Sequence, residues 1–307
     1  MAPRTHAWRG FRRVLCSVDF SELSRLALRH AEAIARRANA SLTVLYVNDP
    51  MLIAAAAAAL HDRHIIERSR RELRAFVKAT LPRRSAGQTQ TCLGSGHPPN
   101  EILRIAGRAG ADLLVLGTQG LTGTDRLLIG STTLTVLRRT TVPVLAVPRP
   151  GDAAPNMLPP SWPGGRLMAA VELDRMGRQD IETASVIAQW FGASLLLVHV
   201  VNAVSAPAWL IADRRAHDRI RLSRAQRQLE RLITAARPQV NAETRVVWGQ
   251  PADELAALAA TTDIGLLVMS LKDRRGWFGT RRGSVSYHVL THAVSPVLAY
   301  PPHWRPR

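Results

Sequence analysis

The sequence predicts an α/β protein of two tandem domains, each an open five-stranded parallel sheet covered by helices on both faces. Three observations carry this prediction. Short apolar runs, typical of buried strands, alternate along the chain with segments that repeat apolar residues at helical spacing. The alternation stops in a stretch rich in proline and glycine, residues 150–165, and then starts again. The second run repeats the first, which marks an internal duplication.

The first domain, residues 1–149, shows the alternation clearly. Ser21 is a plausible N-cap for the first helix, and Pro82 is expected to end a long, arginine-rich helix that begins near Met51. A further helix is expected near residues 100–107, and another is expected to end near Arg139. The expected strands are residues 14–18, 40–47, 89–93, 113–116 and 144–147.

A shift of 153 residues lays the second domain, residues 166–307, on the first without a net gap across the core. Agreement in a single register over such a length marks a tandem repeat. The shift brings identical residues together along both halves, as in the pairs Ala40 and Ala193, Gly96 and Gly249, Pro98 and Pro251, Glu101 and Glu254, and Pro143 and Pro296.

The composition limits the class of protein. The chain has 307 residues, 46% of them hydrophobic, and a net charge of +18 that comes almost entirely from arginine. No nucleic-acid-binding module accompanies this charge, so we expect no nucleic acid partner. The longest apolar stretch, Met51 to Leu60, is too short to span a bilayer, and the two cysteines fit a reducing compartment. We therefore expect a cytoplasmic protein without a membrane partner.

A glycine-bearing segment, Gly117 to Thr132, lies between an expected strand and an expected helix. Free backbone N–H groups at such a helix start are a common way of binding phosphate. Asp19 ends the first expected strand. If the first and fourth strands are neighbours, Asp19 and this segment face one another across the crevice where strand order reverses.

These residues resemble a known family. The stretch VDFSE, Val18 to Glu22, is similar to the opening of universal stress protein domains, and the spacing of Gly117, Gly120, Gly130 and Ser131 resembles that family's ATP-binding signature. The resemblance covers both halves and implies a Rossmann-like fold similar to the adenine nucleotide alpha hydrolases.

The resemblance also implies a role for each matching residue. Asp19 would hold the ribose or adenine end of ATP, and the backbone of Val47 would meet the base. The glycines would let the backbone approach the phosphates, to which Ser131 and Thr132 would donate hydrogen bonds. Mg²⁺ could accompany the ATP, and another adenine nucleotide is an alternative. The residues implied are Asp19, Val47, Gly117, Gly120, Gly130, Ser131 and Thr132.

The second half departs from this signature. Glu172 takes the place of Asp19, and Ser270 and Asp273 take the places of Gly117 and Gly120. A carboxylate at Asp273 would repel phosphate. Only the pair Gly283-Ser284 is kept. We therefore expect one competent nucleotide site, in the first half, and a degenerate partner domain.

The expected function is that of an ATP-binding stress-response sensor or regulator with an unknown regulatory protein partner. The family's domains commonly pair through their last strands. We therefore expect an intramolecular pseudo-dimer with residues 144–147 and 297–300 at the contact, and a homodimer is a further possibility. The sequence holds no GxxxxGK[ST] motif and no metal-ligand cluster, so neither catalytic residues nor a metal site are expected. Two alternatives stay open, a slow ATPase or nucleotide-transfer enzyme and a protein-interaction module without nucleotide.

Overall fold

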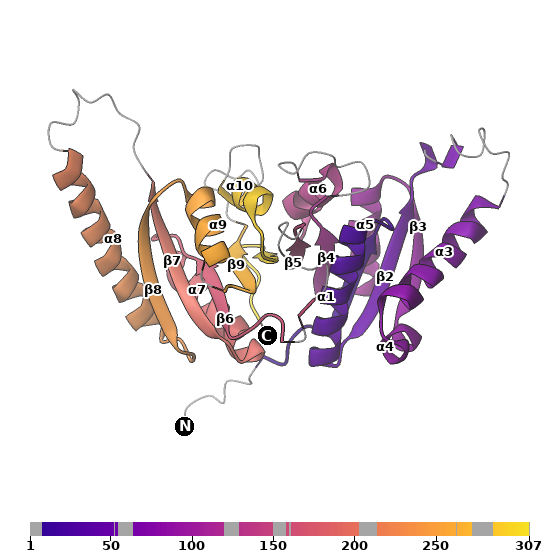
Figure 1. The fold of residues 1–307 in the computed structure, drawn as a ribbon, viewed down its shortest axis with the longest axis horizontal. Helices are drawn as coiled ribbons and strands as arrows, with labels where there is room; N and C mark the ends of the chain where they lie inside the picture. The colour runs from indigo at the N-terminus through magenta and orange to yellow at the C-terminus, as the bar shows by residue number, and fades with distance from the viewer. Residues whose placement is uncertain are drawn as a thin grey trace.

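The computed structural model describes residues 8–51, 53–54, 64–119, 129–149, 158–159, 161–202, 214–261, 263–271 and 285–306. Strands and helices alternate along both halves, as Figure 1 shows. The described elements of the N-terminal half are β1 (Arg13–Val18), α1 (Glu22–Ala38), β2 (Ser41–Asn48), α3 (Ile65–Thr80), α4 (Arg83–Gln88), β3 (Gln90–Ser95), α5 (Pro98–Ala109), β4 (Leu113–Gly117), α6 (Ser131–Arg139) and β5 (Val144–Val147). Those of the C-terminal half are β6 (Arg166–Ala170), α7 (Gly177–Phe191), β7 (Ser194–Asn202), α8 (Arg214–Ala236), β8 (Ala242–Gly249), α9 (Pro251–Thr261), β9 (Leu266–Ser270), α10 (Val285–His292) and β10 (Val297–Tyr300).

The ten strands form one continuous sheet in the order β3-β2-β1-β4-β5-β10-β9-β6-β7-β8. Within each half every described strand pair is parallel, as predicted. The two halves join through an antiparallel pair of their last strands, β5 and β10. Among the described strands, only the outermost strand of each half, β3 or β8, therefore has an edge without a neighbouring strand.

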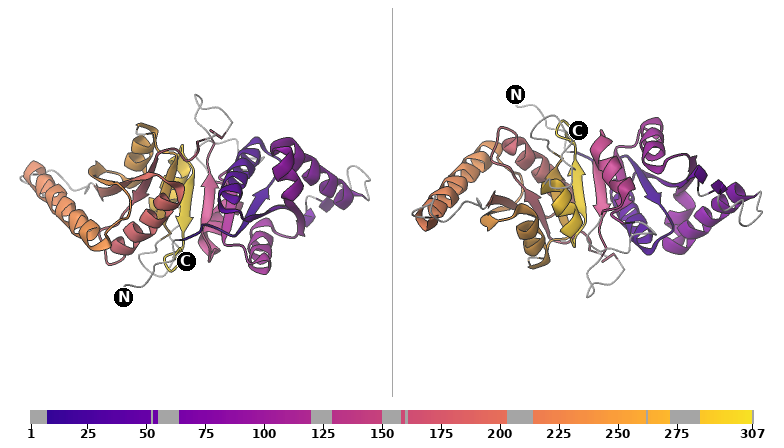
Figure 2. Two further views of the ribbon diagram at one scale, coloured as in Figure 1. Left: turned by 90° about the horizontal axis from the view of Figure 1, so that it is seen from below. Right: turned by 90° about the horizontal axis from the view of Figure 1, so that it is seen from above.

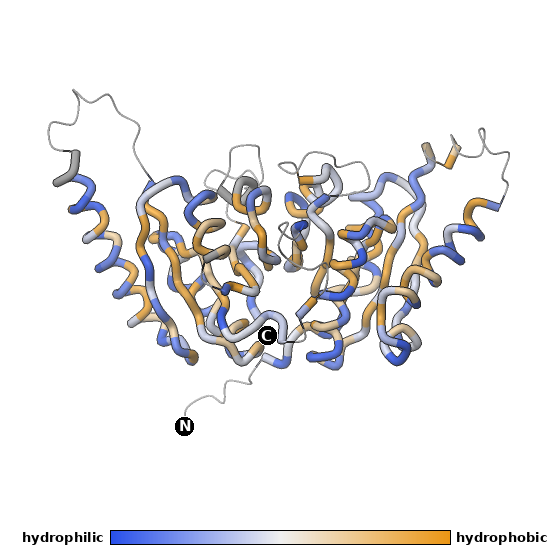
Figure 3. The backbone as a smooth tube through the Cα atoms, viewed as in Figure 1, coloured by the Kyte–Doolittle hydropathy of each residue, from blue (hydrophilic) through white to orange (hydrophobic). Residues whose placement is uncertain are grey.

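The two last strands are buried on both faces because helices cover both sides of the sheet. Successive residues of β5 belong to different hydrophobic clusters, Val144 and Ala146 to one and Leu145 and Val147 to the other. One cluster lies under α1, α3, α7 and α8, and the other under α5, α6, α9 and α10. Both clusters run through both halves. Hydrophobic colour accordingly concentrates along the strands in Figure 3.

The seam between β5 and β10 follows an approximate two-fold axis. Leu145 pairs with Leu298, its equivalent 153 residues later, and Val144 pairs with Ala299 as Ala146 pairs with Val297. Such reciprocal contacts are those of an isologous dimer interface. The two views of Figure 2 show β5 and β10 side by side at the centre of the molecule. The contact expected between residues 144–147 and 297–300 is therefore present within the chain.

Aromatic residues strengthen the same seam. Trp8 and Phe11, which precede β1, pack against Trp190 at the end of α7 and against Trp304 after β10, with ring centroids 5.4 to 6.3 Å apart. Arg37 of α1 donates two hydrogen bonds to the carbonyl oxygen of Trp190, at 2.8 and 3.0 Å. These contacts hold the segment before β1 and helix α1 to the end of α7, and hold the segment before β1 to the residues after β10.

Two elements differ from the sequence prediction. The segment predicted as one helix from Met51 is helical at residues 50, 51, 53 and 54 and again in α3 from Ile65, but the backbone of His64 between them is not helical. Residues 55–63 lie outside the described part. A short helix, α4, follows Pro82 and was not predicted. Its six residues bury no side chain, so it has no apolar periodicity that the sequence could have revealed.

Candidate functional site

The strand order needed for the crevice considered in the sequence analysis is present in the N-terminal half. Strand β1 lies between β2 and β4, so the first and fourth strands are neighbours and the condition is met. Chain order runs outward from β1 to β2 and β3 on one side and from β4 to β5 on the other. Ligands of open α/β sheets bind beyond the carboxyl ends of the strands at such a reversal.

The strand register brings three of the predicted site residues to this edge. Val18 pairs with Tyr46 of β2, which places Asp19 beside Val47. Cys16 pairs with Val115 of β4, and two further steps along both strands bring Val18 beside Gly117. Asp19, Val47 and Gly117 therefore lie within one residue of the same level, where three neighbouring strands end.

Asp19 is fixed by the turn into α1. Its Oδ1 accepts hydrogen bonds from the backbone N–H of Ser21, at 3.1 Å, and from the Ser21 hydroxyl, at 2.5 Å. The Ser21 Oγ in turn caps the helix by accepting the N–H of Ser24 at 3.1 Å, as predicted from its place in the sequence. The carboxylate is therefore held in one orientation before any ligand arrives.

The start of α6 is anchored over the end of β4. The Thr133 hydroxyl donates to the carbonyl oxygen of Gly117 at 2.7 Å, and the N–H of Gly130 donates to that of Thr118 at 2.6 Å. A Cβ atom on Gly117 would lie 3.1 Å from Leu23 Cγ, so glycine permits the close approach of β4 to α1. Gly120 lies outside the described residues.

The first turn of α6 offers free donors. Gly130 is the N-cap and provides no side-chain acceptor, so the first N–H groups of the helix have no intrahelical partner. Ser131 is exposed and Thr132 half-buried at this turn, and no acidic residue lies there. Backbone donors and the positive end of the helix dipole favour an anionic ligand.

An aromatic wall beside Asp19 was missed by sequence reasoning. Phe20 adopts the left-handed backbone region, with φ 67°. The centroid of its ring lies 4.4 Å from that of Tyr46 and 5.5 Å from that of Phe76. Burial, followed by the charge of Asp19, raises the pKa of Tyr46. A non-glycine residue with positive φ next to a candidate binding carboxylate is a frequent sign of a functional turn.

The C-terminal half repeats the crevice with different residues. Strand β6 lies between β7 and β9, as β1 lies between β2 and β4. Glu172 follows β6 where Asp19 follows β1, and it is exposed. Ser270 ends β9 where Gly117 ends β4, and its buried hydroxyl has no hydrogen-bond partner. Asp273, Gly283 and Ser284 lie outside the described residues.

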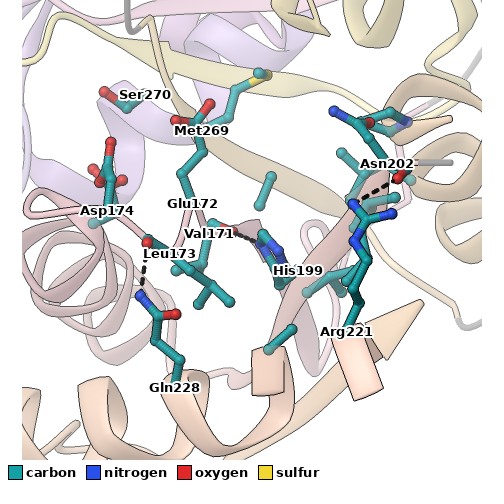
Figure 4. A pocket seen from close by; sticks show the side chains of 18 of the residues that line it. Val171, Glu172, Leu173, Asp174, His199, Asn202, Arg221, Gln228, Met269 and Ser270 are labelled. Atoms are coloured by element: carbon teal, nitrogen blue, oxygen red, sulfur yellow. Dashed lines mark hydrogen bonds between the residues drawn. The ribbon is translucent and has the colours of Figure 1, made fainter. Parts of the chain in front are cut away.

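A cavity of about 500 Å³ occupies the C-terminal crevice. Residues of strands β6, β7 and β9 and of helices α8 and α9 line it. Figure 4 shows Asp174 and Ser270 on one side of it and Arg221 and Asn202 on the opposite side. The polar and charged residues that line it are Glu172, Asp174, Asp180, His199, Asn202, Arg221, Arg224, Gln228 and Ser270.

Smaller side chains contribute to this cavity. Leu173 and His199 both line it, and they take the places of the Phe20 and Tyr46 rings of the first half. The Nδ1 of His199 lies 2.9 Å from the carbonyl oxygen of Val171, and a carbonyl can only accept, so Nδ1 carries the proton. Burial lowers the pKa of His199, which leaves Nε2 as an acceptor at neutral pH.

A buried polar pair lies behind the same cavity. The Tyr300 hydroxyl donates to Asp180 Oδ1 at 3.1 Å, and both side chains are buried. Burial, and after it the charge of Asp180, holds the pKa of Tyr300 well above its ordinary value. The equivalent residues of the first half are Ala27 and Val147. The second half therefore has a hydrogen-bonded pair where the first half has two apolar residues.

Neither a metal cluster nor a spanning helix stands out in the part of the chain that the structure describes. No three His, Cys, Asp or Glu side chains there gather closely enough to hold a metal ion. No helix in that part is both long and apolar enough to cross a membrane.

Comparisons with known proteins agree with this architecture. The model of the universal stress protein family matches residues 10–148 and again residues 165–301. The chain is 31% identical over 144 residues to a universal stress protein of Methanocaldococcus jannaschii, over 46% of this chain and 84% of that one. It is 29% identical over 146 residues to one of Bacillus subtilis, over 45% of this chain and 99% of that one.

Two solved structures share the complete fold. A universal stress protein from Archaeoglobus fulgidus superposes with a TM-score of 0.66 at 18% identity, over 96% of this chain and 98% of that one. A protein of Pseudomonas aeruginosa described as functionally unknown gives 0.62 at 18% identity, over 97% and 95%. Because the family model matches most of the chain in two successive copies, this chain belongs to the universal stress protein family, with two tandem domains.

Proposed function

We propose that the protein binds ATP in its N-terminal half and acts as a cytoplasmic stress-response sensor or regulator. The observation that supports this most directly is the shared edge of β1, β2 and β4. There the fixed carboxylate of Asp19 lies within one residue of the level of Gly117. The start of α6, which has no side-chain cap, is anchored over the end of β4 by its hydrogen bond to Gly117. This edge offers an acceptor for hydroxyl groups and donors for phosphate within one crevice.

The proposed roles follow from the chemistry of each group. The carboxylate of Asp19 accepts from ribose hydroxyls, and the backbone at Val47 meets the base. Gly117, Gly120 and Gly130 leave room for the phosphates, and Ser131 and Thr132 donate hydrogen bonds to them. Mg²⁺ accompanying the nucleotide would offset part of its negative charge.

We propose binding without turnover. Hydrolysis needs a group that orients water and charges that stabilise the transferring phosphoryl group. Among the described residues near the start of α6, the first turn supplies only Ser131, Thr132 and Thr133, none of which is a base or a metal-binding carboxylate. The bound nucleotide would then act as a signal that changes the surface seen by a regulatory protein partner.

Isothermal titration calorimetry with ATP and Mg²⁺ tests the proposal on the full chain. We expect one nucleotide per chain. Asp19→Ala should weaken binding at least tenfold, which corresponds to about 1.4 kcal/mol. Asp19→Asn keeps the acceptor for the Ser21 N–H but removes the charge, and so measures the electrostatic part. Glu172→Ala, the matched change in the second half, should leave the affinity for ATP unchanged.

Four results would each contradict part of the proposal. Two nucleotides per chain would show that the second half is not degenerate. An equal loss in Asp19→Ala and Glu172→Ala would show that Asp19 has no special role. Ligand at about 100 times Kd should add roughly 2.7 kcal/mol to the free energy of unfolding. Absence of binding heat, together with absence of a thermal shift under that condition, would contradict nucleotide binding. Phosphate release that vanishes on Ser131→Ala would make the protein a slow ATPase.

A further inference from the structure

The described lining of the C-terminal cavity carries more acidic than basic side chains. Its described lining holds three carboxylates, Glu172, Asp174 and Asp180, against two guanidinium groups, Arg221 and Arg224. A triphosphate entering it would be repelled by the excess carboxylate, because charges interact strongly in a partly closed site. The cavity nevertheless has the size of a small-molecule site.

The charges of this cavity are separated in space. Figure 4 shows Asp174 and Ser270 on one side and Arg221 on the other, with His199 between them. Glu172 follows β6, is exposed and also lines the cavity. The cavity therefore presents an acidic wall opposite a basic one.

Two buried polar atoms of the cavity are not satisfied within the protein. The Ser270 side chain is 9% exposed, and its hydroxyl has no hydrogen-bond partner. The Nη1 of Arg221 is buried and has none either, although Nη2 donates to the carbonyl oxygen of Asn202 at 3.0 Å and the guanidinium lies 4.8 Å from the centre of the Trp248 ring. Unmade hydrogen bonds of buried groups are costly, so a ligand that completes them gains affinity.

The cavity also has an apolar part to its lining. Val198, Val200, Leu255 and Met269 contribute to it. A ligand whose charges lie at its two ends and whose middle is a hydrocarbon chain would match this distribution. A molecule charged along its length would leave charge against apolar side chains.

From these observations we propose that the C-terminal cavity binds a small dipolar molecule with an ammonium group at one end and a carboxylate at the other, such as an ω-amino acid or a short peptide. The ammonium group faces Glu172, Asp174 and the Ser270 hydroxyl. The carboxylate accepts from Arg221. This site is independent of the nucleotide proposed for the N-terminal half, because no residue is shared.

Three five-carbon compounds that differ only in their end groups test the proposal by calorimetry. They are δ-aminovalerate, which carries one group of each kind, cadaverine, which carries two ammonium groups, and glutarate, which carries two carboxylates. We expect δ-aminovalerate to bind at least tenfold more tightly than either of the others. Glycylglycine and glycine, measured beside them, distinguish a peptide-like ligand from an α-amino acid.

Variants of both sides of the cavity sharpen the test. Arg221→Met keeps an unbranched side chain against Trp248 but removes the guanidinium, so affinity for δ-aminovalerate should fall at least tenfold while that for cadaverine does not fall. Ser270→Ala should weaken δ-aminovalerate severalfold. Arg227→Met removes an exposed arginine of the same helix that does not line the cavity, and should change neither affinity. Circular dichroism confirms that each variant is folded.

The contrary outcomes are distinct. Equal binding of cadaverine or glutarate would overturn the dipolar character of the site. No heat from any of these compounds at millimolar concentration, with folded protein, would overturn the site itself. Competition by ATP that persists in Asp19→Ala would mean that the cavity is a second nucleotide site, and this result would leave the proposal for the N-terminal half standing.

Discussion

The two crevices of this protein share one backbone plan and differ in what fills it. In the first half an aspartate, two aromatic rings and a glycine stand at the ends of the strands, represented by Asp19, Phe20, Tyr46 and Gly117. In the second half a longer acid, an aliphatic side chain, an imidazole and a hydroxyl replace them. The plan fixes where a ligand lies, and the side chains decide its chemistry.

The largest test of this comparison concerns the seam that the halves share. Leu145→Ala and Leu298→Ala each remove a fully buried side chain from the centre of the antiparallel pair, and each should cost about 2–5 kcal/mol of unfolding free energy. Because the two leucines pair with each other, the double variant should not cost the sum. Urea denaturation followed by circular dichroism measures all three.

Unequal losses of unfolding free energy in the two single variants would contradict the symmetry of the seam. If Leu298→Ala were severely destabilising and Leu145→Ala nearly neutral, the seam would belong energetically to one half. A single unfolding transition in every variant is expected, because both hydrophobic clusters run through both halves.

A second test uses a buried histidine of the first half. His30 packs 4.8 Å from Trp162, its Nδ1 lies 2.9 Å from the Leu26 carbonyl oxygen, and burial lowers its pKa to about 4 from 6.5. Between these values the unfolded chain binds more protons than the folded one, so this residue makes stability fall as pH falls from 6.5 to about 4. The difference amounts to about 3 kcal/mol.

The matched variant is His30→Thr, which copies Thr183 of the second half. Denaturant titrations at pH 7 and near pH 4 should show a smaller loss of stability on acidification in the variant than in the parent protein, whatever its stability at pH 7. An identical pH dependence in the two proteins would show that His30 is protonated without cost and that its burial is not maintained in solution.

The smallest expected effect concerns the polar pair found only in the second half. Tyr300→Phe removes a hydrogen bond to the buried carboxylate of Asp180 and should cost about 2 kcal/mol. Combining it with Asp180→Asn in a double-mutant cycle isolates the coupling between the two side chains. A coupling near zero, read from denaturant midpoints, would mean that the pair fills space much as Ala27 and Val147 do.

Much of the fold follows from the sequence because its signals are local. In the first half, apolar runs placed every strand end to within two residues, and Ser21 marked the start of α1. The neighbouring positions of β1 and β4, which the sequence analysis stated as a condition for the crevice, are present in the structure. The roles of Asp19, Val47, Gly117, Gly120, Gly130, Ser131 and Thr132 remain predictions.

The cavity of the second half could not be read in the same way. A cavity depends on the volume of side chains that converge from separate strands and helices, and no single stretch of sequence contains that sum. The signal was present only in the comparison of equivalent positions, where Phe20 becomes Leu173 and Tyr46 becomes His199. The prediction for the second half rested on its missing glycines and did not use the side chains that occupy the crevice instead.

The antiparallel junction of β5 and β10 has an evolutionary consequence. A homodimer of single domains is encoded once, so any substitution alters both of its binding sites together. In this chain the same kind of interface is closed within one polypeptide, and it forms at every protein concentration because the partner is tethered. Each crevice is therefore free to change while the other keeps its residues, and the different side chains at the two sets of strand ends are consistent with such independent change.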